Sequence, residues 1–122
     1  MNPAEHDAAA PFDGAGCSAG ESFALRVLGD DMAPEFLHGE IIIVEPDGAL
    51  ADGSFVVAQH DGEWFFRQLR RAGTGWMLHA LNPARCDLPD LPLADLGAVR
   101  GVVIQKAVPG RRRQSRFYVR RA

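Results

Sequence analysis

The stretch that decides the fold runs Leu25-Arg-Val-Leu-Gly-Asp-Asp-Met-Ala-Pro-Glu-Phe-Leu-His-Gly-Glu-Ile-Ile-Ile-Val-Glu45. Its start, together with the two residues before it, predicts a short strand over 23–28 that ends at a Gly-Asp pair. Residues 32–37 suit at most one helical turn, because their proline lies early, where a missing N–H is tolerated. The β-branched run over 40–45 predicts a strand that is covered on both faces.

Turn signals divide the rest of the chain into further short strands. Asp61-Gly62 separates two strand-like runs, and Asp-Gly in this position is the strongest short-range hairpin signal. Residues 82–97 contain three prolines and predict a loop. Strands are also predicted over 54–59, 63–69, 76–81, 99–108 and 115–121. We therefore expect an all-β fold, a β-barrel-like or sandwich domain of short antiparallel strands with at most one short helix.

Composition indicates one globular domain. The chain has 122 residues, of which 47% are hydrophobic and 24% are charged. Residues 1–21 are rich in Ala, Gly, Asp and Pro without periodicity, and predict a flexible N-terminal arm. The folded domain is expected over 22–108, and 109–122 form a basic C-terminal segment that can supply a final strand. The longest apolar run has four residues, so no membrane association is expected.

Charge is distributed unevenly along the chain. Residues 1–105 hold all 16 acidic side chains and only six arginines, which gives a net charge of −10. Residues 106–122 hold seven basic side chains and no acid, for a net charge of +7. Of the 13 basic residues only Lys106 is a lysine. This count limits which catalytic chemistry the chain can support.

Cysteines and histidines give no metal-binding pattern. Two cysteines are too few for a disulfide framework, so a reducing cytoplasm is the expected location. None of the six candidate ligands pairs at a spacing such as Cys-x-x-Cys, and neither thiol has a positioned base nearby in sequence. We expect no metal and no cofactor. The six residues are Cys17, Cys86, His6, His38, His60 and His79.

The opening stretch resembles the first sequence block of the LexA-like and signal-peptidase-like serine peptidases, the S24/S26 group. That block reads Gly, any residue, a nucleophilic Ser, Met, one residue, Pro, then Asp-Gly-Asp and a β-branched strand. The resemblance continues through 52–58, the hairpin at 61–70, 78–82 and 101–104, and so covers residues 23–106. It implies the all-β fold of this family. The motif positions in register are Gly29, Met32, Pro34, Gly39 and Ile41–Val44.

Both members of the family's Ser–Lys dyad are replaced in this chain. The nucleophile position holds Asp31, and the general-base position on the hairpin strand holds Arg67. Arginine stays protonated in proteins, so Arg67 cannot accept a proton from a hydroxyl. The only lysine, Lys106, lies in the predicted closing strand and not on the hairpin. The resemblance therefore implies a degenerate member, for which no catalytic residue is expected.

The double replacement predicts a contact. If the fold is kept, Asp31 and Arg67 face each other, and a carboxylate can pair with a guanidinium through two hydrogen bonds. The alternative is that each side chain is separately solvated. A buried pair adds little net stability, because desolvation offsets the attraction between the charges.

The favoured function is a catalytically inactive S24-like domain that serves as a protein-binding or dimerisation module in a bacterial regulator. The resemblance implies a cleft beside the dyad that binds an extended peptide by strand addition, and Gly29, Met32, Pro34 and Gly39 mark it. Self-association, or another protein or peptide, is the expected partner. The first alternative is an active S24-type endopeptidase that processes itself or a substrate. Because only about 22 residues precede the expected core, we do not expect the DNA-binding domain of the repressor branch within the given sequence.

The C-terminal segment supports a second alternative, a small nucleic-acid-associated regulator. Basic residues next to Phe117 and Tyr118 can track a nucleic-acid backbone and stack bases. They can equally dock on the acidic body of the same chain or of a partner, or remain solvated. Nucleic acid is not the favoured partner. The basic residues are Arg111, Arg112, Arg113, Arg116, Arg120 and Arg121.

Overall fold

The structure, a computed structural model, describes residues 12–13, 21–110 and 116–118. These residues form strands and turns without a helix, so within them no helix could cross a membrane. The strands are β1 (Phe12–Asp13), β2 (Phe23–Val27), β3 (Ile41–Glu45), β4 (Phe55–His60), β5 (Glu63–Ala72), β6 (Gly75–His79), β7 (Leu91–Leu93), β8 (Val99–Ala107) and β9 (Arg116–Phe117). The all-β prediction is confirmed.

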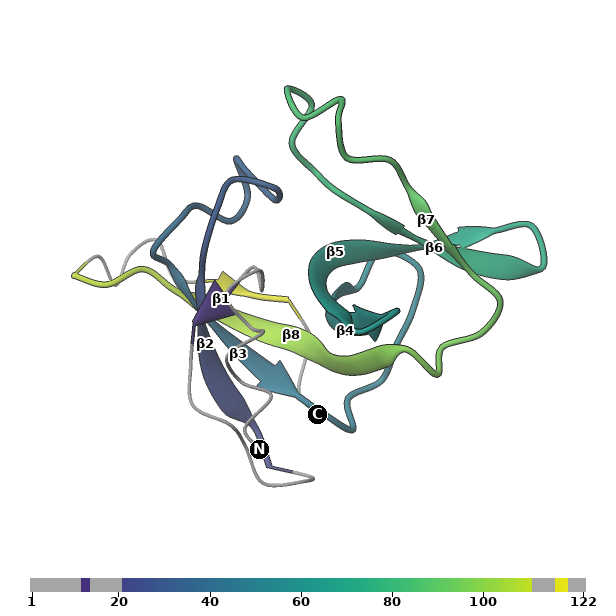
Figure 1. The fold of residues 1–122 in the computed structure, drawn as a ribbon. Coiled ribbons are helices and arrows are strands. Elements are labelled where there is room, and N and C mark those ends of the chain that lie inside the picture. The colour runs from purple at the N-terminus through teal and green to yellow at the C-terminus, as the bar shows by residue number, and fades with distance from the viewer. Residues whose placement is uncertain (1–11, 14–20, 111–115, 119–122) are drawn as a thin grey trace.

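Strand β8 joins the two halves of one antiparallel sheet (Figure 1). The strand order is β1-β2-β3-β8-β4-β5-β6-β7, and β9 also pairs with β8. The first part of β8 pairs with β4, from Val99 to Val102, and the later part pairs with β3, from Val102 to Ala107. Because β8 is shared, the position of β2 and β3 relative to the β4–β7 meander depends on this one strand.

The hairpin of β4 and β5 forms as its sequence predicts. Both turn residues have positive φ angles, 53° for Asp61 and 82° for Gly62, as a two-residue type I′ turn requires. The register then places His60 opposite Glu63 and Val57 opposite Phe66. Arg67 is thereby held on β5, within the longest strand of the sheet.

Glycine is required where β3 and β8 approach each other. A Cβ atom on Gly101 would lie 2.4 Å from the Val44 Cγ1 atom and 3.3 Å from the Glu45 carbonyl oxygen. No side chain fits in this space without displacing the neighbouring strand. Strand β8 can therefore approach β3 closely at Gly101 because this residue has no side chain.

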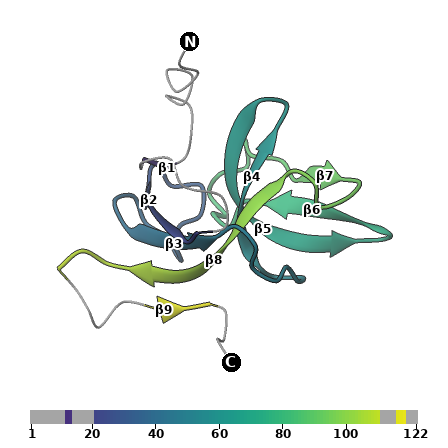
Figure 2. The same ribbon diagram turned by 90° about the horizontal axis from the view of Figure 1, so that it is seen from below.

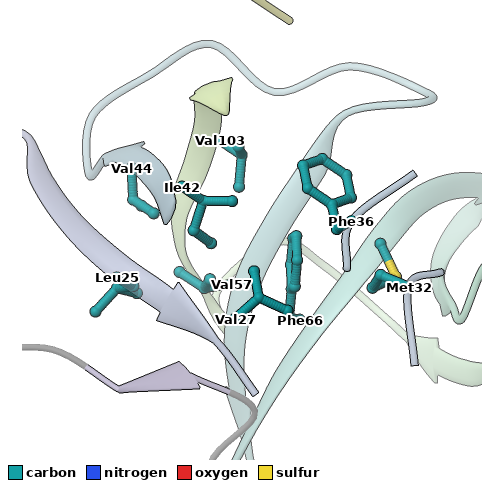
Figure 3. Close-up of a cluster of buried hydrophobic side chains, with 9 residues drawn as sticks. All are labelled: Leu25, Val27, Met32, Phe36, Ile42, Val44, Val57, Phe66 and Val103. Carbon is teal, nitrogen blue, oxygen red and sulfur yellow. The ribbon is translucent and has the colours of Figure 1, made fainter. Parts of the chain in front are cut away.

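Two hydrophobic clusters form the core, one on each side of β4 and β8. Successive residues of a strand point to opposite faces, so Val57 and Val103 enter the first cluster while Val56 and Val102 enter the second. In the first cluster Met32 and Phe36 come from the segment between β2 and β3 (Figure 3). Its members are Leu25, Val27, Met32, Phe36, Ile42, Val44, Val57, Phe66 and Val103.

The structure modifies several expectations from the sequence. Only one face of β3 is fully buried, since Ile42 and Val44 are enclosed while Ile41 and Ile43 are half-buried. The expected loop over 82–97 contains the three-residue strand β7, which pairs with β6. Within the expected N-terminal arm, residues 12–13 form β1 and pair with β2. Segment 32–37 is a series of turns that contains one helix-type bond, from the Phe36 N–H to the Met32 carbonyl at 3.0 Å.

Truncating a buried ring should cost far more than truncating an exposed one. Phe36 is fully buried against the Phe55 and Phe66 rings, at 4.9 Å from each centroid, so Phe36→Ala should lower the free energy of unfolding by about 3–5 kcal/mol. Phe117 is 68% exposed, so Phe117→Ala should change it by less than about 1 kcal/mol. Urea unfolding followed by fluorescence measures both. Equal losses would contradict the assignment of Phe36 to the core.

Candidate functional site

The loop between β2 and β3 is shaped by two of the predicted motif glycines. Gly29 has a φ angle of 92° and donates its N–H to the His38 Nδ1 atom at 2.9 Å. Gly39 has a φ angle of 94° and donates its N–H to the Val27 carbonyl at 2.8 Å. Both angles favour glycine over other residues. These two hydrogen bonds hold the two ends of the β2–β3 loop together, and Asp31 lies within the loop between them.

Of the other two motif residues, Met32 anchors this loop. It is 1% exposed and packs in the first hydrophobic cluster. Pro34 is exposed in the turn that follows. Met32 thus lies in the core and not in an open groove. The two glycines and Met32 explain why Asp31 has a defined position, whereas the role of the four residues in binding a peptide remains a prediction.

Asp31 and Arg67 form an ion pair. The Arg67 Nη1 atom lies 3.0 Å from the Asp31 Oδ2 atom, and the two side chains are 6% and 24% exposed. The same Nη1 atom donates to the Phe66 carbonyl at 2.9 Å. The guanidinium carbon also lies 5.3 Å from the centroid of the Phe65 ring. Strand β5 and the β2–β3 loop, 36 residues apart in sequence, meet at this pair.

The predicted ion pair is present, with one hydrogen bond in place of the two that such a pair can form. One Arg67 nitrogen reaches one Asp31 oxygen, and the buried Arg67 Nε atom has no hydrogen-bond partner among the described residues. The second oxygen, Asp31 Oδ1, instead lies 3.3 Å from Arg85 Nη1. One carboxylate is thus shared between two guanidinium groups, with one oxygen directed to each.

Arg85 also belongs to the site, which the sequence did not indicate. Its Nε and Nη2 atoms donate to the two oxygens of Asp87, each at 2.9 Å, and its Nη1 atom donates to Asp30. The hydrogen bonds to Asp87 and Asp30 raise the pKa of Arg85 above its ordinary value, and Arg85 in turn lowers the pKa of Asp87. Arg85 is therefore a fixed cation beside Asp31.

Asn82 ties the same loop to the site through backbone groups. Its side-chain nitrogen donates to the Asp30 carbonyl at 2.8 Å, and its backbone N–H donates to the Asp31 carbonyl at 3.1 Å. The loop after β6 and the loop between β2 and β3 rise on the same side of the sheet in Figure 1. In the sequence, the stretch 78–82 resembles the family and pointed to Asn82. That stretch does not indicate that Arg85 also contacts Asp31.

The lysine of the chain is paired with residues other than those around Asp31. Lys106 is 6% exposed and donates to the Glu35 carbonyl at 2.6 Å, and its Nζ atom lies 3.4 Å from Glu40 Oε1. Its ammonium is therefore held by a different pair of residues from those around Asp31. Over the described ranges, no three His, Cys, Asp or Glu side chains are grouped as a metal ion would need. The chemistry that the arrangement supports is charge pairing.

Part of the basic C-terminal segment docks on the same chain. Arg116 Nη1 lies 3.3 Å from Glu35 Oε2, and the Tyr118 hydroxyl donates to the same oxygen at 2.6 Å. This is one of the three outcomes that the sequence left open for the segment. The other basic residues of the predicted patch lie outside the described residues. They are Arg111, Arg112, Arg113, Arg120 and Arg121.

Two open hollows on the described surface lie apart from the ion pair. One, of about 380 Å³, lies where the β2–β3 loop meets the end of β8, and Gly39 contributes to its wall. The other, of about 580 Å³, lies beside β6 and β7 and includes Trp76. Neither is lined by Asp31 or Arg67, so neither coincides with the ion pair.

Comparison with known proteins identifies the family. The sequence profile described as Peptidase S24-like matches residues 4–104. The chain belongs to the Peptidase S24-like family. This match includes Asp31, Arg67 and Arg85, and the all-β antiparallel architecture agrees with the fold expected for the S24-like family.

Several S24-like relatives are regulators by name. The prophage repressor CohE of Escherichia coli is 42% identical over 64 residues, which are 51% of this chain and 29% of the relative. The HTH-type transcriptional regulators for conjugative elements R391 of Providencia rettgeri and SXT of Vibrio cholerae are each 36% identical over 93 residues, 70% of this chain and 42% of each relative. The chain thus matches less than half the length of these relatives.

Removing Asp31 should leave the buried charge of Arg67 without its partner. Asp31→Ala should lower the free energy of unfolding by roughly 2–4 kcal/mol, whereas Asp30→Ala, at a side chain that is 60% exposed, should cost less than about 1 kcal/mol. The double variant Asp31→Ala/Arg67→Met should recover part of the loss, because the stranded charge is gone. Chemical denaturation measures all three. Equal effects of the two aspartates would contradict the ion pair.

The Arg85–Asp87 contact should contribute to stability only above acidic pH. The folded pKa of Asp87 is lowered, so its stabilising contribution is present above the unfolded pKa, about 3.9, and is lost as the pH falls through the lower folded pKa. In Arg85→Gln the Asp87 titration midpoint, followed by NMR of its carboxyl carbon, should rise toward about 3.9. Arg100→Gln, whose arginine donates to the Gly97 carbonyl, should leave the midpoint unchanged.

Proposed function

We propose that this chain is a catalytically inactive S24-like domain that acts as a protein-binding or dimerisation module of a regulatory protein. The observation that carries the proposal is the ion pair between Asp31 and Arg67, at the positions where the family resemblance puts the nucleophile and the base. In place of a hydroxyl and a neutral amine, the site holds two opposite permanent charges. Their mutual pairing leaves no group to attack a peptide bond.

The physical chemistry of the pair supports inactivity in two ways. A Ser–Lys mechanism needs a base that can lose its proton near neutral pH, and a guanidinium does not. The Asp31 carboxylate is also engaged by Arg85, so neither of its oxygens is free of a cation. Lys106 cannot substitute as the base without leaving its own partners, the Glu35 carbonyl and Glu40.

The names of the relatives support the regulatory part of the proposal. They are a prophage repressor and transcriptional regulators, and this chain corresponds to a part of each. A domain that keeps the family fold without its chemistry can still supply a surface for association. We place this chain in such a role in a bacterial regulator, with a second copy as the first partner to test.

One contact argues against the nucleic-acid alternative. Arg116 and Tyr118 contact Glu35 within the chain, so binding phosphate and base with both side chains would compete with this contact. The intramolecular contact also neutralises charge between the basic segment and the acidic body. Salt-sensitive DNA binding that is lost on replacing Arg111, Arg112 and Arg113 by serine would support the alternative instead.

Intact-mass spectrometry tests inactivity. After long incubation of the purified chain at alkaline pH, we expect one species at the full mass, because no nucleophile–base pair is present. The variant Asp31→Ala, which also lacks a hydroxyl, is the matched control for breakdown unrelated to this site. A discrete shorter product in the wild-type chain that is absent in Asp31→Ala would revive the peptidase function.

Sedimentation velocity tests association independently of chemistry. We expect the sedimentation coefficient of the wild-type chain to rise with protein concentration toward that of a dimer. A value that stays that of a monomer over the whole range would refute self-association, while the mass measurement would still decide whether the chain is an active peptidase.

A further inference from the structure

The C-terminal strand β9 is held on β8 by few but specific contacts. Phe117 pairs with Gln105 and Arg116 with Lys106, and the Tyr118 N–H donates to the Ile104 carbonyl at 2.9 Å. Figure 2 shows β9 as a short strand alongside the later part of β8. The backbone of β8 therefore accepts this segment as an added strand, on the edge opposite β3 and beyond the residues that pair with β4.

The carboxylate of Glu35 recognises two side chains of this segment. The Tyr118 hydroxyl donates to Glu35 Oε2 at 2.6 Å, and Arg116 Nη1 lies 3.3 Å from the same oxygen and 3.4 Å from Oε1. Glu35 is itself positioned, because its backbone carbonyl accepts a hydrogen bond from the buried Lys106 at 2.6 Å. One positioned carboxylate thus binds both a basic residue and a tyrosine two positions further along the chain.

The Tyr118 ring packs against two aromatic rings of the same chain. The centroid of the Tyr118 ring lies 5.1 Å from that of Phe36 and 5.2 Å from that of Phe55. Burial and the neighbouring Glu35 carboxylate raise the pKa of the Tyr118 hydroxyl, so it stays protonated and can donate. Phe117, between the two recognised residues, is 68% exposed. We call Glu35, Phe36, Phe55 and the β8 edge at 104–106 the C-terminal groove.

The contacts of the groove do not depend on how the segment is connected to β8. Val108, Pro109 and Gly110 begin the connection, and Gly110 adopts a φ angle of 75°, which marks a turn. An identical segment from a second chain can make every one of these contacts. Exchange of an identical element is a low-cost route to a dimer, and the balance depends on the effective concentration of the tethered segment.

Charge complementarity allows a second copy as the occupant. The segment from 106 to 122 carries a net charge of +7 and the rest of the chain carries −10, so the segment of one copy is attracted to the body of another copy as well as to its own. We propose that the C-terminal groove is a strand-exchange site, in which Arg116 and Tyr118 of a second copy bind Glu35, Phe36 and Phe55. Reciprocal exchange gives a closed twofold dimer. This names the contact for the self-association proposed above and rests on that proposal.

A complementation experiment tests the exchange with full-length chains. Glu35→Arg disables the groove but keeps the segment, and Tyr118→Ala disables the segment but keeps the groove. We expect each variant alone to dimerise about 10–100-fold more weakly than wild type, because the ring contacts and the hydrogen bonds to Glu35 are lost. An equimolar mixture should form a heterodimer, which differently tagged chains reveal by native mass spectrometry.

Two further variants separate exchange from misfolding. Glu35→Arg/Arg116→Glu reverses both charges and should restore dimerisation, which a chain that failed to fold would not do. Phe117→Ala removes the neighbouring exposed ring and should dimerise like wild type. If the wild-type chain dimerises but the mixture gives no heterodimer and both single variants dimerise normally, strand exchange is wrong while self-association stands. A wild-type chain that stays monomeric refutes both.

Discussion

One carboxylate, that of Asp31, neutralises the buried guanidinium of Arg67, and three segments distant in sequence meet at it. The β2–β3 loop carries the acid, strand β5 carries Arg67, and the loop after β6 contributes Arg85. A charge on a side chain that is only 6% exposed is costly without a partner. The position of both loops over the sheet is therefore coupled to this single group.

In the inactive domain that we propose, the ion pair accounts for how the S24-like fold is kept. The two positions that the family resemblance assigns to a hydroxyl and an amine hold a carboxylate and a guanidinium here. Their ion pair joins the β2–β3 loop to β5. The charged pair keeps the loop attached to β5, and Arg85 adds a second attachment. A second acid–base cluster, around Glu35, Glu40 and Lys106, holds the other side of the same loop and provides the contact for the C-terminal strand.

Local patterns predicted much of the fold because they act over a few residues. The Asp61-Gly62 turn follows from the low cost of positive φ at these residue types, and the hairpin register follows from the turn. The β-branched run predicted β3, although one of its faces is only half-buried. Strand β7 was not predicted, because Leu91–Leu93 contains a proline and is too short to show alternation.

The sequence alone determined the strand pattern, the turn chemistry and the absence of a serine and lysine at the motif positions. Through the family resemblance it also predicted that Asp31 and Arg67 would face each other, with separate solvation as the alternative. Only the tertiary structure decided that Asp31 is shared with Arg85, 54 residues away, and that Tyr118 docks on Glu35, 83 residues away. Such contacts depend on where loops and chain ends return to the sheet, and no local periodicity encodes that path.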